Sequence, residues 1–290
     1  MTTKTEDDYR KIVESTTELP TLSAVITKIN EATASPTTSA PAVAAIIQED
    51  QALSANVLKL VNSSFYGFPK QINSISRAIV ILGFRKVRSL ALTTSTINAF
   101  KGREVNLDIS EFWSHCLGTA ICAEVMAKHF GLREVDDAFI AGLIHDVGKL
   151  VIEICFKEES SKISGIVEKR SMVWIRDVEE EVMDIDHSRV GFWLIKKWAL
   201  PENLSAVTRF HHKPLLARQS APLVHVVHVA DIIARSLRVG NGGDETVPEI
   251  DKEVWDKLGL GAKILDKLFD ETLVGLNKAE AFFDLIRQST

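Results

Sequence analysis

The chain has 290 residues, of which 46% are hydrophobic and 25% are charged. These are the proportions of a globular protein, and they exclude a disordered chain, a collagen-like repeat and a disulfide-stabilised miniprotein. The 39 acidic and 34 basic residues give a formal charge of −5, which disfavours a nucleic-acid partner because binding to nucleic acid draws on excess positive charge.

Residues 1–18 form a polar, acidic N-terminal segment without the apolar stretch of a signal peptide. No apolar run elsewhere approaches the roughly 18 residues that a membrane span requires, so we expect no membrane partner. The cysteines Cys116, Cys122 and Cys155 form no Cys-x-x-Cys pair, which is typical of reduced thiols in a cytosolic protein. The sequence therefore predicts a soluble, cytoplasmic protein.

Helical periodicity dominates the chain, and no alternating strand pattern bounded by hairpin turns is found, so the predicted fold class is all-α. Residues 19–100 are expected to form an N-terminal lobe of four short amphipathic helices. These begin near Leu22, Ser39, Asp50 and Ser74. The fourth helix is expected to end at Gly83 in the left-handed conformation. None of the four is long enough to be stable alone, so they should pack together.

A polar stretch, residues 101–110, separates this lobe from a second helical block at residues 109–237, and we interpret it as a hinge or linker. A second linker, residues 239–249, is rich in glycine and acidic residues and is expected to be a mobile surface loop. Residues 251–288 are expected to form closing helices that pack on the second block. The predicted architecture is thus a helical protein with two lobes.

Two buried carboxylates are predicted in the second block. His145 and Asp146 follow the apolar segment 139–144, and Asp231 lies within the apolar segment 224–233. Burying an ionised carboxylate costs several kcal/mol unless a cation compensates it. A metal ion would supply that charge, and ion pairs with Arg189, Arg209 or Arg235 are the alternative. Gly142 allows another helix to approach the first segment closely.

Other segments of the block offer histidine nitrogens. His115 lies near the start of a long amphipathic helix, His187 precedes Gly191 by one turn, and the pair His211-His212 ends a helix. Each could be a metal ligand or an ordinary hydrogen-bonded core or surface histidine. His225 and His228 are interpreted as structural or supporting groups.

A short basic cluster, residues 85–88, is interpreted as a solvated helix face, with contact to a phosphate or an acidic partner as the alternative. Cys116 is interpreted as a core residue, because helical neighbours such as His115 and Cys116 do not face each other.

In these motifs the chain resembles the HDOD proteins, a branch of the HD-domain superfamily whose name stands for HD-related output domain. In the first lobe the likeness lies in residues 19–22, 57–67 and 74–83. In the second block it lies in residues 112–115, 141–150, 187–191, 198–201, 211–214 and 230–231. The resemblance implies a helical bacterial signalling module, often found beside receiver or cyclic-dinucleotide enzyme domains, and we expect this chain to be a stand-alone version.

The resemblance also implies a set of metal ligands. The residues that match ligand positions of the dinuclear HD-GYP phosphodiesterases are His115, His145, Asp146, His187, His211, His212 and Asp231. Asp146 is the candidate bridging ligand. Five imidazoles and two carboxylates without a thiolate suit one or two ions of iron, manganese, nickel or zinc. The residues after His212 lack the Asp-Gly-x-Gly-Tyr-Pro segment of HD-GYP proteins, which argues against cyclic di-GMP hydrolysis.

We therefore expect an HDOD-type regulatory protein that binds metal in its second block and signals to an unidentified protein through its N-terminal lobe. The alternative is a metal-dependent phosphohydrolase acting on a nucleotide or another phosphoester. In that case a metal-bound hydroxide would attack phosphorus, and Lys149, the candidate catalytic side chain, would contact a phosphate oxygen. Lys149 as a solvated helix-end residue is an equally weighted alternative, and a structural adaptor without metal is a third hypothesis.

Overall fold

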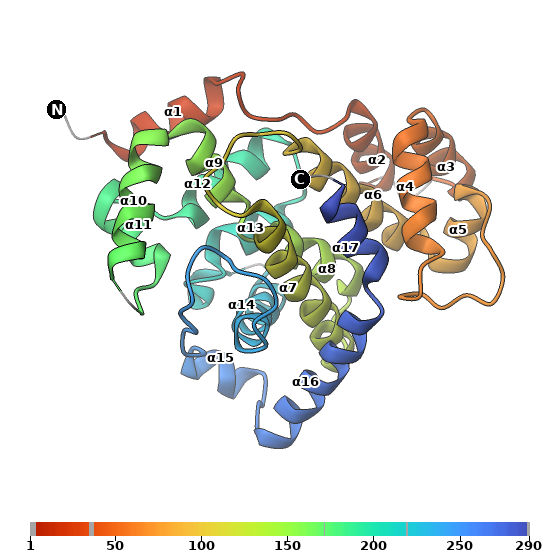
Figure 1. Ribbon diagram of the computed structural model, residues 1–290. Coiled ribbons are helices and arrows are strands. Elements are labelled where there is room, and N and C mark those ends of the chain that lie inside the picture. Colours follow the sequence, from red (N-terminus) through yellow and green to blue (C-terminus); the bar gives the residue numbers. More distant parts are fainter. Residues whose placement is uncertain (1–3, 35–37, 171, 219, 289–290) are drawn as a thin grey trace.

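The computed structural model describes residues 4–34, 38–170, 172–218 and 220–288, and these residues form helices and connecting segments without a strand (Figure 1). The predicted all-α fold class is confirmed. Figure 1 shows α2 to α5 gathered on one side of the molecule and α9 to α15 on the other. Within the described ranges, every helix is too short or too polar to traverse a lipid bilayer.

The first lobe is built from helices of which the first four begin at or near the positions that the sequence predicts. They are α2 (Ala24–Ala34), α3 (Ala40–Gln48), α4 (Gln51–Val61), α5 (Ile75–Leu82) and α6 (Phe84–Ala99). The side chains of Ser39, Asp50 and Ser74 each accept a hydrogen bond from a backbone N–H in the first turn of the helix that follows. Gly83 has the positive φ that was expected, but its ψ of 155° is extended, so it joins α5 directly to α6 instead of ending a helix in the left-handed conformation.

The sequence predicts four helices in the first lobe, and α6 is not one of them. Its buried residues include Lys86, Ser89, Thr93, Thr94 and Thr96 beside the apolar ones. Because polar residues occupy buried positions, the helix has no separate apolar face, and periodicity of the kind that identifies a surface helix does not reveal it. It is nevertheless the helix on which α2, α4 and α5 pack.

The second block surrounds a long central helix. Its helices are α7 (Ile109–His129), α8 (Val135–Ile144), α9 (Val147–Cys155), α10 (Lys157–Lys169), α11 (Ile175–Met183), α12 (His187–Lys197), α13 (Glu202–Phe210), the 3₁₀ helix η1 (Pro214–Leu216) and α14 (Ala221–Ser236). Helix α7 packs against both α8 and α14. A Cβ atom on Gly142 would lie 2.7 Å from Cα of Ala120, so glycine is what lets α8 lie directly against α7, as the sequence predicts.

The polar N-terminal segment contains α1 (Glu6–Ser15), which packs on α9 and α12 of the second block. Thr5 and Asp8 form a reciprocal capping pair at its start. Its Tyr9 and Val13 side chains are buried. Lys197 in α12 donates hydrogen bonds to the carbonyl oxygens of Val13 (3.0 Å) and Thr16 (2.7 Å). The first lobe is therefore attached to the second block at both of its ends.

Two ion pairs join α6 to the second block. Lys86 pairs with Glu124 of α7, and both side chains are buried. Arg88 pairs with Asp137 of α8. The interpretation of this basic cluster as a solvated helix face is therefore wrong for Lys86 and Arg88, because their acidic partners lie in the same chain.

The glycine-rich segment 239–249 lies at the surface, as the sequence predicts, but part of it packs inward: Gly242 and Asp244 are buried, whereas Asn241, Glu245, Val247 and Glu249 are exposed. The N–H of Asn241 donates to the carbonyl oxygen of Glu111 (3.1 Å), and the side chain of Asp244 is buried. A Cβ atom on Gly240, which has a φ of +61°, would lie 2.2 Å from that same carbonyl oxygen. We call residues 240–247 the cover loop, because they lie over the side chains described in the next subsection.

The last residues form α15 (Lys252–Lys257), α16 (Ala262–Asn277) and α17 (Glu280–Arg287). Helices α16 and α17 pack on α7, and α17 also contacts α4 of the first lobe. They therefore pack on the central helix and help to fix the two lobes relative to each other.

Candidate metal centre

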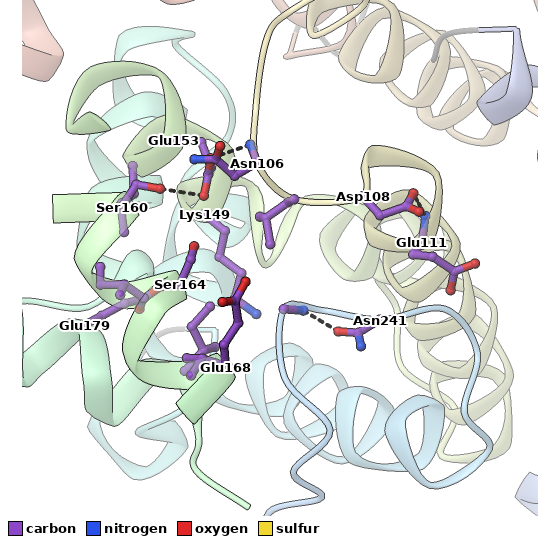
Figure 2. Close-up of a pocket in the computed structure, with 16 residues that line it drawn as sticks. Asn106, Asp108, Glu111, Lys149, Glu153, Ser160, Ser164, Glu168, Glu179 and Asn241 are labelled. Atoms are coloured by element: carbon purple, nitrogen blue, oxygen red, sulfur yellow. Dashed lines mark hydrogen bonds between the residues drawn. The ribbon is translucent and has the colours of Figure 1, made fainter. Parts of the chain in front are cut away.

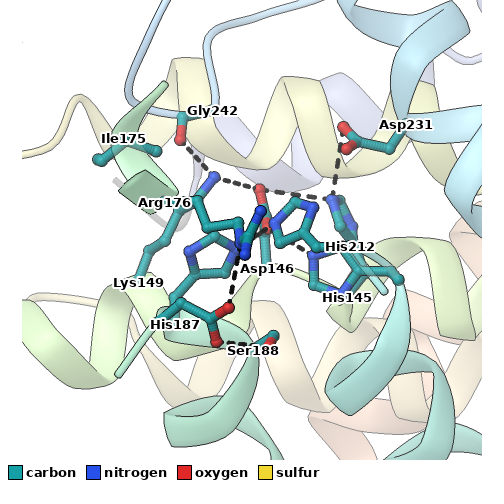
Figure 3. Close-up of polar contacts among 12 residues, drawn as sticks. His145, Asp146, Lys149, Ile175, Arg176, His187, Ser188, His212, Asp231 and Gly242 are labelled. Atoms are coloured by element: carbon teal, nitrogen blue, oxygen red, sulfur yellow. Dashed lines mark hydrogen bonds and ion pairs between the residues drawn. The ribbon is translucent and has the colours of Figure 1, made fainter. Parts of the chain in front are cut away.

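All seven histidine and aspartate residues that the sequence indicates come together at one place in the second block. His115 projects from α7, His187 is the first residue of α12, and Asp231 lies in α14. The turn between α8 and α9 supplies His145 and Asp146, and the end of α13 supplies His211 and His212. Figure 3 shows Asp146 among the side chains of His145, His187 and Lys149. Ends of helices and one turn thus converge on a single carboxylate.

The side chains form two groups that share Asp146. The nitrogen and oxygen atoms of Asp146, His187, His211 and His212 lie within 4.8 Å of one another, and so do those of His115, His145 and Asp146. Oδ1 of Asp146 is 3.0 Å from Nε2 of His187 and 3.5 Å from Nε2 of His211. Its Oδ2 is 3.4 Å from Nε2 of His145 and 3.7 Å from Nε2 of His115. One oxygen therefore faces each group, which is the geometry that a bridging carboxylate needs.

Four buried atoms of the cluster form no aligned hydrogen bond among the described residues, although Oδ1 of Asp146 lies 3.0 Å from Nε2 of His187 and Nε2 of His115 lies 3.1 Å from Oδ1 of Asp231. They are Nε2 of His115, His145 and His211, and Oδ1 of Asp146. Nδ1 of His145 lies 2.7 Å from the carbonyl oxygen of Gly142, and Nδ1 of His211 lies 3.0 Å from that of Thr208. A carbonyl can only accept, so Nδ1 of both rings carries a proton, and Nε2 is the atom of each ring that faces the cluster and could bind an ion. The residues present therefore fit a divalent transition-metal ion.

Glu179 of α11 is a part of the cluster that the sequence does not reveal. Its buried carboxylate accepts from the backbone N–H of His187 (2.8 Å) and lies 2.5 Å from Nδ1 of the same residue. A carboxylate in this position fixes the orientation of a histidine whose other nitrogen faces a metal ion. Glu179 stands in a run of three glutamates, and no sequence signal distinguishes it from its exposed neighbours.

The charges in the cluster shift the pKa values of its histidines in opposite directions. Burial lowers the pKa of His145, but Asp146 and Asp231 together outweigh it and raise that pKa to about 9. At His187 burial again lowers the pKa, but Glu179 and Asp146 together outweigh it and raise the pKa to about 9. Burial lowers the pKa of His211 to about 4. Because a metal ion binds the unprotonated ring, its binding is expected to release protons from His145 and His187.

Asp231 has a basic partner. Its Oδ1 lies 3.1 Å from Nε2 of His115 and accepts a hydrogen bond from Nε of Arg235 (3.0 Å) one turn further along α14. The ion-pair alternative with Arg235 is thus found, and the burial of Asp231 does not by itself require a metal ion.

Lys149 is also part of the cluster. Its Nζ atom donates to Oδ2 of Asp146 (2.6 Å) and to the carbonyl oxygen of Gly242 in the cover loop (2.7 Å), contacts that Figure 3 shows as dashed lines. The side chain is only 2% exposed. The alternative of a solvated helix-end residue is therefore wrong.

His228 lies outside the cluster and supports it. Its Nδ1 donates to the carbonyl oxygen of His211 (2.8 Å), and its Nε2 accepts from the N–H of Asp251 (3.1 Å). It thereby connects the end of α13 to the start of α15. His225 is also mostly buried in α14 and contributes no atom to either group.

Two cavities border the cluster on either side of the cover loop. One, of about 330 Å³, is shown in Figure 2 and has Lys149 and Glu179 in its wall. Glu153 in this wall accepts hydrogen bonds from the N–H of Asn106 (2.7 Å) and the hydroxyl of Ser160 (2.6 Å). The other cavity, of about 580 Å³, is bordered by His115, Arg235 and the cover loop. The cluster is buried, and these cavities are the spaces next to it.

A family model, the HDOD domain, matches residues 19–214 of the chain. The crystal structure of an HDOD domain protein of unknown function from Geobacter sulfurreducens is 28% identical, with a TM-score of 0.79, over 93% of this chain and 95% of that one. A protein from Shewanella amazonensis SB2B, provisionally called a phosphohydrolase, is 22% identical with a TM-score of 0.74, over 97% of this chain and 98% of that one. At that identity the likeness shows the fold alone.

Two further proteins are longer than this chain. A protein from Marinobacter aquaeolei VT8, provisionally called a signal transduction protein, is 21% identical with a TM-score of 0.77, over 99% of this chain and 62% of that one. An uncharacterized protein of Treponema pallidum (strain Nichols) is 27% identical over 81% of this chain. The matched part is 46% of that relative, so the chain spans about half the length of the curated protein that it matches.

Proposed function

The chain belongs to the HDOD domain family, and from this membership we propose that it is a regulatory protein that binds one or two divalent transition-metal ions in its second block. The observation that carries the proposal is the set of four buried ligand atoms, on His115, His145, Asp146 and His211, that form no aligned hydrogen bond among the described residues. Buried polar atoms are normally satisfied, so a group of them around one carboxylate points to an ion.

The donor atoms indicate which ions the centre would hold. Imidazole nitrogens and carboxylate oxygens without a thiolate suit iron, manganese, nickel or zinc better than calcium or magnesium. His187, His211, His212 and Asp146 would hold one ion. His115, His145 and Asp146, with Asp231 beside them, would hold the other.

The chain's own residues prepare the centre for an ion. Glu179 and the carbonyl oxygens of Gly142 and Thr208 orient three of the imidazoles through Nδ1. Lys149 and Arg235 compensate the buried charges of the two aspartates in the absence of an ion, and the cover loop shields the group from bulk water. Bound ions would supply Lewis acidity and would tie α7, α12, α14 and the end of α13 together.

A regulatory role is supported by the position of the centre and by the surface of the first lobe. The ligands are almost fully buried, so an ion would change how firmly helix ends and the cover loop are held. Val80, Ile81 and Phe84 are large apolar residues exposed at the junction of α5 and α6. Exposed apolar clusters of this kind mark protein contacts. The proposal therefore includes signalling to a protein partner, in the cytoplasm, where the free cysteines would remain reduced.

A second candidate function, a metal-dependent phosphohydrolase, is favoured by Lys149. This ammonium group lies beside Asp146 and also borders a cavity, so it is available to contact a phosphate oxygen of a nucleotide or another phosphoester. The relative from Shewanella that is provisionally called a phosphohydrolase has the same fold. Turnover of phosphoesters with added Mn²⁺ or Fe²⁺, abolished in Asp146→Ala, would establish this activity.

The first test is the metal content of protein purified without chelators or a histidine tag, measured by elemental mass spectrometry. We expect about one or two equivalents of iron, manganese, nickel or zinc, and their loss in an Asp146→Ala/Asp231→Ala variant. Absence of metal, even after reconstitution, would contradict both candidate functions and leave an adaptor without a metal centre.

Metal-loaded and metal-free protein should also differ in hydrogen exchange. The N–H of Asn241, which is bonded to Glu111, should exchange more slowly when ions are bound, because the cover loop lies over the centre. Equal exchange in the two states would show that metal binding does not change how firmly the cover loop is held.

A further inference from the structure

Two helices each expose a pair of neighbouring apolar side chains to solvent. In α5 the pair is Val80 (68% exposed) and Ile81 (39%), and in α16 it is Leu273 (43%) and Val274 (53%). Other sides of the two helices are buried, since α5 packs on α3 and α6 and α16 packs on α7. Both pairs are therefore presented outward by helices that the fold holds in place.

A charged residue precedes each pair at the same spacing. Arg77 lies three residues before the first member of the pair in α5, and Asp270 lies three residues before the first member of the pair in α16. Residues three and four apart lie on the same side of a helix, so each charge lies beside both apolar side chains of its pair. Both charged side chains are exposed, and neither forms an ion pair within the described ranges. The two helices thus carry the same pattern with opposite charges.

We call Arg77 with its apolar pair the basic face and Asp270 with its apolar pair the acidic face. Residues 51–103, which include the basic face, contain eight basic residues and no acidic one, so all 39 acidic residues of the chain lie elsewhere. On α16, Lys267 is already paired with Glu271 (3.7 Å), which leaves the charge of Asp270 available. Two basic faces would repel each other, whereas the basic face of one copy attracts the acidic face of another.

From this complementarity we propose that the protein associates with a second copy of itself, the basic face of α5 packing against the acidic face of α16 in the other copy. When the two helices lie side by side in the same direction, their equal spacing places Arg77 opposite Asp270 and one apolar pair against the other. A two-fold symmetric dimer would contain this contact twice, because each copy carries both faces. Each contact is small, so association should be weak and should depend on concentration.

The inference rests on the proposed function in one respect. The basic face includes Val80 and Ile81, part of the surface to which that function assigns a protein partner, and a second copy is the occupant that the charges favour. No residue of either face contributes a ligand to the metal centre, so self-association does not require a bound ion.

The test is sedimentation velocity of the full chain at protein concentrations up to about 0.5 mM, a range that detects weak complexes. We expect the wild type to associate, and Arg77→Asp and Asp270→Arg to associate about tenfold more weakly or worse, because each variant places like charges opposite each other. Lys169→Asp and Glu158→Arg make the same changes of charge at exposed residues of α10, which Figure 1 shows on the side of the molecule away from α5. These control variants should associate like the wild type.

An equimolar mixture of Arg77→Asp and Asp270→Arg gives a second, independent result. In a mixed dimer both contacts again join opposite charges, one between the two native residues and the other between the two substituted ones. The mixture should therefore associate as strongly as the wild type, although neither variant does so alone. A wild type that stays monomeric over the whole range, face variants that associate like the wild type, or a mixture that does not recover would each overturn the proposal.

Metal content of the same samples, measured by elemental mass spectrometry, separates this proposal from the metal centre. A protein that binds metal but stays monomeric overturns the contact between copies and leaves the metal centre supported. A protein that associates through the two faces without metal supports the contact and contradicts the centre.

Discussion

The Nζ atom of Lys149 lies 2.6 Å from Oδ2 of Asp146, and both side chains are buried. A positive charge is thus built into the cluster beside the carboxylate that faces both groups of histidines. The same ammonium group donates to the carbonyl oxygen of Gly242, so it also joins the cluster to the cover loop. A divalent ion bound to Oδ2 of Asp146 would have to share that oxygen with this lysine.

Replacing Lys149 by methionine is expected to strengthen metal binding. A fixed positive charge within a few Å of a divalent ion opposes its binding, and its removal should lower the dissociation constant about tenfold or more. Competition with a fluorescent chelator measures the constant, and Lys162→Met, an exposed lysine of α10, is the control. Weaker binding in Lys149→Met would mean that the lysine chiefly holds Asp146 and the cover loop in place.

Substitution of Asp146 and substitution of His187 should remove different numbers of bound metal ions. Because the oxygens of Asp146 face both groups, Asp146→Asn should lose all bound metal, whereas His187→Ala should lose only the ion of its own group. Elemental mass spectrometry of both variants, with folding verified by circular dichroism, gives the ratio of ions to protein. Retention of one equivalent in Asp146→Asn would contradict a bridging role.

Glu179 should tune the affinity of the centre without touching an ion. Glu179→Gln keeps the size of the side chain but weakens its hold on Nδ1 of His187, so metal affinity should fall about 10- to 100-fold. The control is Glu181→Gln, two residues along the same helix, whose exposed carboxylate pairs with Arg170. If both substitutions reduce affinity equally, the effect arises from general charge and not from the orientation of His187.

The buried pair of Lys86 and Glu124 should stabilise the junction of the two lobes in a pH-dependent way. At pH 7, Glu124→Gln leaves the lysine without a charged buried partner, which should lower the free energy of unfolding by about 3 kcal/mol. Lys128→Met, which removes the 62% exposed second partner of Glu124, should cost only about 0.5 kcal/mol.

The sign of the pH dependence follows from the pKa of Glu124. Burial alone would raise it, but Lys86 and Lys128 outweigh burial and hold it below its ordinary value of 4.5. The carboxylate therefore contributes stability above pH 4.5 and loses it as the pH falls through the folded-state pKa. Urea unfolding should show the gap between wild type and Glu124→Gln narrowing as the pH falls below 4.5. A gap that stays constant down to pH 3 would argue against the ion pair.

Replacing Gly142 and Gly165 by alanine should change the stability of the protein in opposite directions. A Cβ atom on Gly142 would lie 2.7 Å from the backbone of Ala120, and overpacking of this kind costs about 1 to 3 kcal/mol. Gly165, within α10, has nothing within 4 Å of such an atom, so Gly165→Ala should stabilise the protein by about 0.5 to 1 kcal/mol. Thermal unfolding checks both. A stable Gly142→Ala variant would show that α7 and α8 can separate without cost.

The helices that the sequence reveals are those with a polar side or a capping residue. Ser39, Asp50 and Ser74 begin helices where the sequence places them, because one side chain satisfies the first turn locally. The sequence pattern does not reveal helix α6, because tertiary packing buries its threonines and Lys86 and the sequence therefore shows no apolar stripe. The inward packing of the cover loop depends on Glu111, Lys149 and Arg235, and composition alone cannot show contacts with residues so distant in sequence.

The sequence reveals those residues of the candidate site that are polar or charged within an apolar segment. Histidines and aspartates in apolar helices stand out, and the structure brings all seven to one place. The sequence indicates Arg235 only as one of three arginines that could pair with Asp231. Two side chains four residues apart on a helix can point away from each other, so the spacing alone does not show the contact. Glu179 has no sequence signal, because its role depends on the turn that places α11 against the start of α12.

Because α1 packs on α12, its tertiary contacts can form only late in the synthesis of the chain. Thr16 and Lys197, whose contact fixes the start of the chain, are 181 residues apart. At ordinary rates of protein synthesis, roughly 10 to 40 s pass between the translation of these two residues. Until α9 and Phe156 have also been translated, Tyr9 and Val13 lack the surfaces on which they pack, so the nascent chain exposes the apolar side of α1, which a chaperone could bind. The first lobe can gather its own helices in that time, but its N-terminal anchor is among the late contacts to form.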